Sequence, residues 1–230
     1  NPDVHADPDG KKVEAFNVVG FIDNSAKKTV IIGAHYDHLG MGEFNALSTN
    51  TKEPYNGADD NASGVAAMIE LASLLKNAKY THNNYLFIAF TGEEMGLFGS
   101  KHFVKQEEDL LKTVNYMLNL DMVGRMNDEK KLIINGVGTS AVWKYVMKTL
   151  EVDSLKIVTT ESGMGPSDHT SFYLNEIPVL HFFTGIHEDY HKPTDDVEKI
   201  NYDGIESVIR YIMTMISRLD DKLKLSYLKT

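Results

Sequence analysis

Residues 85–96 read YLFIAFTGEEMG: six apolar residues, then a turn that carries two adjacent glutamates. An unbroken apolar run of this length is typical of a strand buried on both faces, as in a parallel sheet. Glutamates directly after such a strand are difficult to explain by packing, although acids also favour the first turn of a helix. The stretch therefore predicts a buried strand that delivers Glu93 and Glu94 to a site at its carboxyl end.

The rest of the chain alternates between strand-like and helix-like segments. Residues 61–75, for example, repeat apolar side chains at helical spacing. The predicted helices are 61–75, 99–103, 139–150 and 202–219. The predicted strands are Asn17–Ile22, Thr29–His35, Tyr85–Thr91, Met117–Val123, Leu132–Gly136 and Pro178–Phe183. This alternation predicts an α/β fold of three layers, α/β/α, with helices on both faces of a mixed, mostly parallel central sheet.

The composition narrows the class of protein. A chain of 230 residues suits one large domain, so we predict a single domain over residues 1–230. The net charge of −10, without a Lys/Arg-rich block, argues against a nucleic-acid partner, and no apolar run is long enough to span a membrane. Cysteine is absent, which excludes thiolate ligands and a Cys nucleophile within this chain. A metal would therefore bind to histidines and carboxylates.

Polar side chains stand at the carboxyl ends of the predicted strands. His35 ends one strand, Asp121 lies within the apolar run 117–123, and His191 follows the last strand. A buried carboxylate such as Asp121 needs a hydrogen-bond partner or a metal, because an unpaired one is costly. Open α/β sheets bind ligands beyond the carboxyl ends of their strands. These residues, with Glu93 and Glu94, are therefore expected to meet at one rim of the sheet.

Two neighbouring carboxylates can orient the histidines. On an extended chain His35 and Asp37 point to the same side, so Asp37 can accept the ring N–H of a metal-bound His35. Asp195 or Asp196 can do the same for His191.

Two aspartates, Asp59 and Asp60, precede a predicted helix, where N-capping and the helix dipole favour acids in any case. One of them can also bridge two cations. The segments together then offer two imidazoles, three carboxylates and a spare glutamate, which leaves a coordination position for a shared water. Each segment alone has an ordinary structural explanation, but their combination predicts a two-metal hydrolytic site, with cations about 3.5–4 Å apart.

The motifs resemble, in order, those of the M28 family of zinc aminopeptidases. They read His-x-Asp, Asp-Asp-Asn-x-Ser-Gly, Glu-Glu, Leu-Asp-Met-Val-Gly, Ser-Asp-His and Tyr-His-x-Pro-x-Asp, from about His35 to Asp196. The resemblance implies a zinc-exopeptidase, phosphorylase/hydrolase-like fold and a single catalytic domain. It further implies two Zn²⁺ ions, peptide substrates with a free N-terminus and the release of their N-terminal residues. Family habit also implies a secreted or periplasmic protein.

The resemblance also assigns roles to residues. It implies that His35 and Asp121 hold one metal, that Glu94 and His191 hold the other, and that Asp60 rather than Asp59 bridges them. The implied metal ligands are thus His35, Asp60, Glu94, Asp121 and His191.

The remaining implied roles surround the metals. Glu93 would be the general base and Tyr190 would steady the oxyanion. Asp37 and Asp195 would orient ligands, and Asp168 and His169 would belong to the wall of the substrate pocket. No family role transfers to His38.

Three alternatives stay open. A glutaminyl cyclase has the same fold but uses one zinc and commonly carries Trp before the last His; here Tyr190 is at that place and the only Trp is Trp143, which favours the peptidase. A non-enzymatic scaffold of this fold would usually have lost ligands, and all five remain. A carboxypeptidase of the same superfamily would be longer.

Several properties are not readable from this chain. They are the preferred N-terminal residue, aminopeptidase against dipeptidase preference, the native metal and the oligomeric state. The chain starts at Asn1 without a visible signal peptide, so we expect a processed domain.

Overall fold

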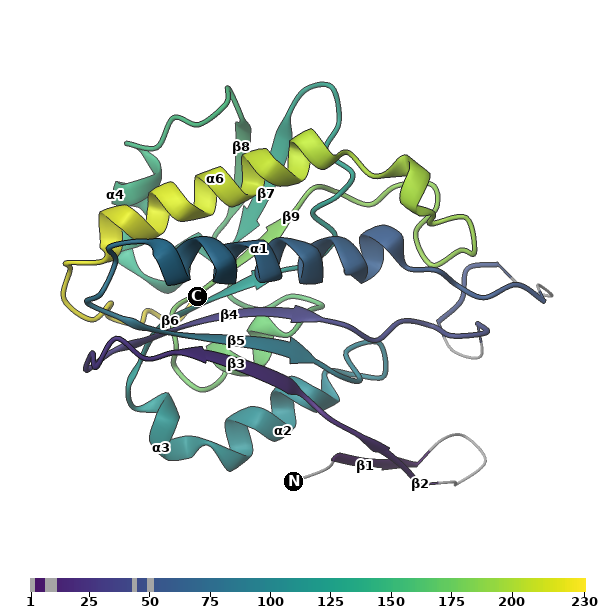
Figure 1. The fold of residues 1–230 in the computed structure, drawn as a ribbon, viewed down its shortest axis with the longest axis horizontal. Coiled ribbons are helices and arrows are strands. Elements are labelled where there is room, and N and C mark those ends of the chain that lie inside the picture. Colours follow the sequence, from purple (N-terminus) through teal and green to yellow (C-terminus); the bar gives the residue numbers. More distant parts are fainter. Residues whose placement is uncertain (1–2, 7–11, 43–44, 49–51) are drawn as a thin grey trace.

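A seven-stranded sheet with the order β3-β5-β4-β6-β9-β7-β8 forms the centre of the computed structural model (Figure 1). The structure describes residues 3–6, 12–42, 45–48 and 52–230. Strands β5, β4, β6 and β9 run parallel, whereas β3 is antiparallel to β5, and β7 is antiparallel to β9 and parallel to β8. The strands are β3 (Val18–Ile22), β4 (Thr29–His35), β5 (Asn84–Phe90), β6 (Val114–Leu120), β7 (Lys131–Asn135), β8 (Lys156–Thr160) and β9 (Val179–Phe183). The predicted mixed, mostly parallel sheet is confirmed.

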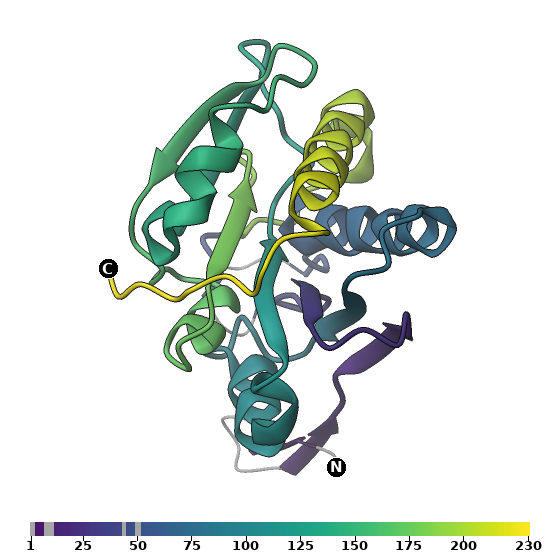
Figure 2. The ribbon, with the colours of Figure 1, turned by 90° about the vertical axis from the view of Figure 1, so that its left-hand side faces the viewer.

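Helices cover both faces of this sheet (Figures 1 and 2). One face packs against α1 (Gly64–Asn77), α4 (Ala141–Met147) and α6 (Tyr202–Leu219). The other face packs against α2 (Phe98–Gln106) and α5 (His169–Tyr173), and the short α3 (Glu108–Leu111) follows α2. Successive side chains of β4 point to opposite faces of the sheet. Val30 and Ile32 pack in the core on the side of α1, and Ile31 packs in the core on the side of α2. The three predicted layers are therefore confirmed.

Some boundaries differ from the predictions. Strand β6 ends at Leu120 rather than at Val123, because the chain turns at Met122, whose φ is +54°. Helix α1 begins at Gly64 rather than at Asn61, because Asp60 and Asn61 lie in the preceding turn (Ala58–Ser63) with non-helical backbone angles.

Three strands were not predicted at all. Strand β8 is a largely exposed edge strand, so it lacks the apolar run that marks a buried one. Strands β1 (Asp3–Ala6) and β2 (Lys12–Ala15) form a separate antiparallel ribbon near the N-terminus.

Within the described part of the chain, none of the helices combines the length and the apolar character that crossing a bilayer requires.

Packing of α1 on the sheet can be tested with two residues of that helix. Leu71 is completely buried, whereas Ile69 is 63% exposed. We expect Leu71→Ala to lower the free energy of unfolding by about 2–5 kcal/mol, because it leaves a cavity under the helix. The control Ile69→Ala should change it by less than about 0.5 kcal/mol. Urea unfolding measures both, and equal losses would contradict this packing.

Candidate metal centre

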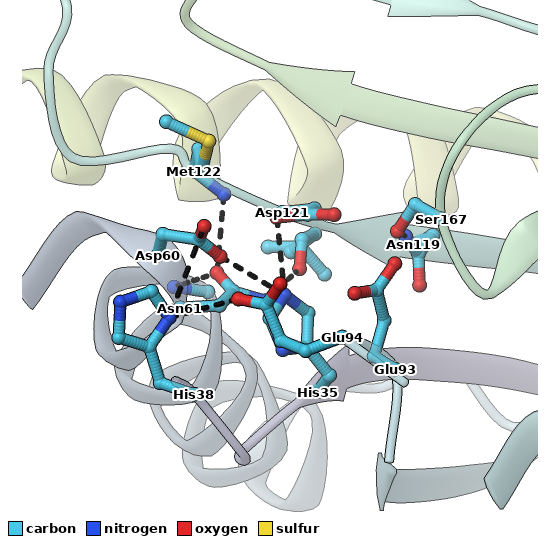
Figure 3. Close-up of polar contacts among 12 residues, drawn as sticks. His35, His38, Asp60, Asn61, Glu93, Glu94, Asn119, Asp121, Met122 and Ser167 are labelled. Carbon is cyan, nitrogen blue, oxygen red and sulfur yellow. Dashed lines mark hydrogen bonds and ion pairs between the residues drawn. The ribbon is translucent and has the colours of Figure 1, made fainter. Parts of the chain in front are cut away.

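The carboxyl ends of the parallel strands bring the predicted site residues together. His35 is the last residue of β4, and Asp121 directly follows β6. Thr91 and Gly92 separate β5 from Glu93, and Gly92 has a φ of +63°, which turns the chain from the strand into the site. Figure 3 shows His35, Asp60, Glu94 and Asp121 gathered at this rim.

The carboxylate of Asp60 lies between two imidazoles. Its Oδ1 is 3.2 Å from Nε2 of His35, and its Oδ2 is 3.3 Å from Nε2 of His191. His35 Nε2 is also 3.4 Å from Oδ1 of Asp121, and His191 Nε2 is 3.3 Å from Oε2 of Glu94. The site thus divides into two groups of nitrogen and oxygen atoms that share Asp60, and each group can hold a cation.

The neighbouring Asp59 points away from these groups. Its carboxylate accepts hydrogen bonds from the backbone N–H of Gly124 (2.6 Å) and from the Ser63 hydroxyl (2.9 Å), and it lies 3.1 Å from Nε2 of His187. The side chain is completely buried. Asp59 therefore ties the turn before α1 to the loop after β6, and it leaves the shared position to Asp60.

The main chain of this turn is held by Asp195. One oxygen of its carboxylate accepts the backbone N–H groups of Asp59 (2.9 Å) and Asp60 (3.0 Å). The prediction that Asp195 or Asp196 orients His191 is wrong. Instead, Nδ1 of His191 lies 2.8 Å from the backbone carbonyl of Asn45, a loop residue far away in the sequence.

The carboxylate of Asp37 also acts on a different partner than predicted. Nδ1 of His35 is 3.1 Å from the backbone carbonyl of Asp37 but 3.8 Å from its carboxylate. That carboxylate accepts the backbone N–H groups of Glu93 (3.1 Å) and Glu94 (3.3 Å). The local chain thus orients His35 through its main chain, while the Asp37 side chain positions the glutamate pair.

The two adjacent glutamates have opposite electrostatic environments. Burial, together with the nearby carboxylates of Asp121, Asp168 and Glu94, raises the pKa of Glu93 to about 10. Burial would also raise the pKa of Glu94, but hydrogen bonds from His191 and His38 outweigh it and lower that pKa to about 2. Such a divergence lets one carboxyl group carry a proton while its neighbour stays ionised.

Carboxylates also raise the pKa of the two histidines. Burial opposes their charge, but the carboxylates of Asp121 and Asp60 hold the pKa of His35 well above its usual value. Asp60 and Glu94 likewise raise the pKa of His191 to about 10. The buried carboxylates therefore need a positive charge between them, which is what a cation would supply.

A cavity of about 150 Å³ opens beside these groups. The ring of Tyr190 stacks on His191 with centroids 3.8 Å apart, and the residue lines this cavity. Burial raises the pKa of Tyr190, so its hydroxyl stays protonated. Apolar surface comes from Met122, Phe183 and Ile186.

Two residues predicted for the pocket wall lie behind it. Asp168 and His169 are completely buried. Pro166 and His181, which are near them, line the cavity instead. His169 stacks on His181, with ring centroids 4.6 Å apart, so it supports the wall. Burial raises the pKa of Asp168 to about 7.

The sequence alone did not indicate the contacts of two histidines. His38, three residues after His35, lies 2.8 Å from Glu94, and His187 contacts Asp59. A signal existed only for His38, because its spacing from His35 keeps it near the same rim.

Comparison with known proteins agrees with the fold and the motif order. The family model "Peptidase family M28" matches residues 17–216, so this chain belongs to that family. It is 34% identical over 181 residues to a probable leucine aminopeptidase of Trichophyton verrucosum, covering 73% of this chain and 45% of that protein. It is 31% identical over 188 residues to aminopeptidase YwaD of Bacillus subtilis, covering 77% and 38%. The chain thus spans less than half the length of these two relatives.

A solved structure is similar as well. The zinc aminopeptidase BSAP from Bacillus subtilis superimposes with a TM-score of 0.71 at 25% sequence identity, covering 96% of this chain and 54% of that chain. The resemblance to the M28 family is thereby confirmed, and so is the predicted fold.

The role of Asp195 can be tested against its neighbour. Asp195→Ala should lower the free energy of unfolding of the metal-free protein by about 2–4 kcal/mol, since each buried donor left unpaired costs roughly 1–3 kcal/mol. Asp196, whose carboxylate accepts a hydrogen bond from Asn56 at an exposed position, provides the control. For Asp196→Ala we expect less than about 1 kcal/mol. Chemical denaturation compares the two, and similar losses would argue against the buried hydrogen bonds of Asp195.

Proposed function

We propose that this chain is the catalytic part of a zinc-dependent aminopeptidase in which two zinc ions share Asp60. Membership of peptidase family M28 supports the reaction class, and the names of its relatives and of a similar structure support zinc and N-terminal cleavage. The observation that carries the two-metal proposal is the placement of Asp60, whose two carboxylate oxygens face different histidines.

The residues present suit zinc. The donors are imidazole nitrogens and carboxylate oxygens, both common zinc ligands, and they are gathered at a buried site. The proposed ligands are His35 and Asp121 for one ion, Glu94 and His191 for the other, and Asp60 for both. When bound, the pair of ions would polarise the scissile carbonyl and acidify a water molecule between them.

Glu93 is the proposed general base. Its backbone N–H is held by Asp37, and its side chain points towards Asn119 and Ser167, away from Asp60 (Figure 3). It therefore contributes no oxygen to either group of ligands. Cations bound beside Glu93 would lower this raised pKa, so that Glu93 would rest ionised, take a proton from water and later return it to the leaving amine.

Tyr190 is the proposed hydrogen-bond donor to the substrate carbonyl. It lines the same cavity as Glu93, and its protonated hydroxyl is suited to stabilising negative charge on that oxygen. The substrates would be peptides with a free α-amino group, because the carboxylates at this rim favour an ammonium ion. Secretion or a periplasmic location stays a prediction.

Glu93→Gln keeps the shape of the side chain and removes its ability to accept a proton. We expect kcat to fall by about 10²–10⁴-fold, with zinc content unchanged. Glu108→Gln, in the short helix α3, is the control and should leave both unchanged. Hydrolysis of an aminoacyl-amide and elemental analysis are the measurements. Full activity of Glu93→Gln would contradict its role as the base.

Removal and return of zinc test the metal count. Treatment with a chelator should abolish activity, and titration with zinc should restore it with two equivalents bound per chain. N-terminal glutamine peptides should release free glutamine rather than pyroglutamate. One tightly bound zinc per chain, with cyclisation and no released amino acid, would instead identify a glutaminyl cyclase.

A further inference from the structure

His38 lies at the edge of the proposed metal site without being one of its predicted ligands. Its Nδ1 is 2.8 Å from Oε1 of Glu94 and 3.9 Å from Oδ2 of Asp60 (Figure 3). Only 10% of its side chain is exposed. Its other nitrogen, Nε2, is buried and has no hydrogen-bond partner in the part of the chain that the structure describes. The polar contacts of this ring are therefore directed at the metal site.

The two oxygens of Glu94 are divided between two histidines. Oε1 faces His38, and Oε2 is 3.3 Å from Nε2 of His191. A carboxylate that ligates zinc offers only lone pairs, so the proton in the short contact would belong to Nδ1 of His38. The oxygen that remains on the side of His191 and Asp60 is Oε2.

We propose that His38 is a positioning residue for the second zinc ion. Its Nδ1–H holds Oε1 of Glu94, so that Glu94 presents Oε2 alone to the ion shared with His191 and Asp60. This inference rests on the proposed two-metal function, and it adds a residue that the family resemblance did not assign.

The packing around His38 keeps its ring in place. Gly57 has a φ of +61°, and a Cβ built there would lie 2.7 Å from Cγ of His38, so the glycine makes room for the imidazole. The ring also forms a T-shaped contact with the ring of His191, with centroids 6.0 Å apart and planes at 72°. A donor held this firmly fixes the end of a glutamate side chain, which otherwise has three rotatable bonds.

A direct ligand role for His38 is the competing explanation. Its ring nitrogen lies with oxygens of Asp60 and Glu94 in a group whose atoms are all within 4.8 Å of one another. The two roles make opposite demands on Nδ1, because a ligand must offer a lone pair and a positioning residue must offer a proton. Asparagine separates them, since its side-chain amide can place an N–H near the position of Nδ1 but is a poor substitute for an imidazole ligand.

The test measures zinc affinity at both sites by competition with a chromophoric chelator, with bound zinc counted by elemental analysis. His38→Ala should keep one tight zinc and bind the other about 10–100-fold more weakly, the usual cost of losing a residue that orients a metal ligand. His38→Asn should recover most of that loss. If the alanine variant does not fold, His38→Leu, which fills similar space without a donor, replaces it.

The control is His82→Asn. Nδ1 of His82 makes a similar contact, 2.9 Å from Oδ2 of Asp220, but it lies outside the site on an exposed side chain. Both zinc affinities should stay as in the unaltered protein. Unchanged affinities in His38→Ala would overturn the proposal, and His38→Asn as weak as His38→Ala would show that His38 is itself a ligand. If the unaltered chain binds fewer than two zinc ions, the proposed two-metal function fails instead.

Discussion

The rest of the site depends on one constraint: three carboxylates lie within reach of two imidazoles at a largely buried rim. Without positive charge between them, these carboxylates would repel one another, and burying unpaired charge is costly. The structure meets the constraint by holding the backbone at two of these three acids. Asp195 binds the main chain at Asp60, and Asp37 binds the main chain at Glu94. Few of these side chains are therefore free to relax away from one another.

A second layer of charge supports this arrangement. Nη2 of Arg125 donates a hydrogen bond of 2.9 Å to Asp189, and Nη1 of Arg125 lies 3.7 Å from the carboxylate of Asp195. Lys199 also donates to Asp189, and these cationic partners hold the pKa of Asp189 below its usual range although burial opposes the charge. These ion pairs link the loop that carries His191 to Arg125 in the loop after β6. The hydrogen bonds of Asp195 link the same loop to the turn that carries Asp60.

The fold and the members of the candidate site could largely be predicted from the sequence, because their signals are local. The apolar run before Glu93 marks a buried strand, and an acid such as Asp121 at the end of another marks the same rim. The partners of these residues could not be predicted, because they depend on how loops pack. The carbonyl that orients His191 belongs to Asn45, and no sequence pattern near either residue predicts this contact. Strand β8 was missed for a different reason, since an exposed edge strand needs no apolar pattern.

The distribution of the site along the chain has a consequence for folding. The residues gathered around Asp60 come from separate segments between positions 35 and 191, and they meet only when β4, β5 and β6 are already aligned. An unfolded chain cannot present them together. Any cation that binds this rim therefore binds the native state alone and stabilises it by mass action, by about 2.7 kcal/mol at a free concentration of 100 times Kd. Availability of the metal would then govern what fraction of the chain is folded.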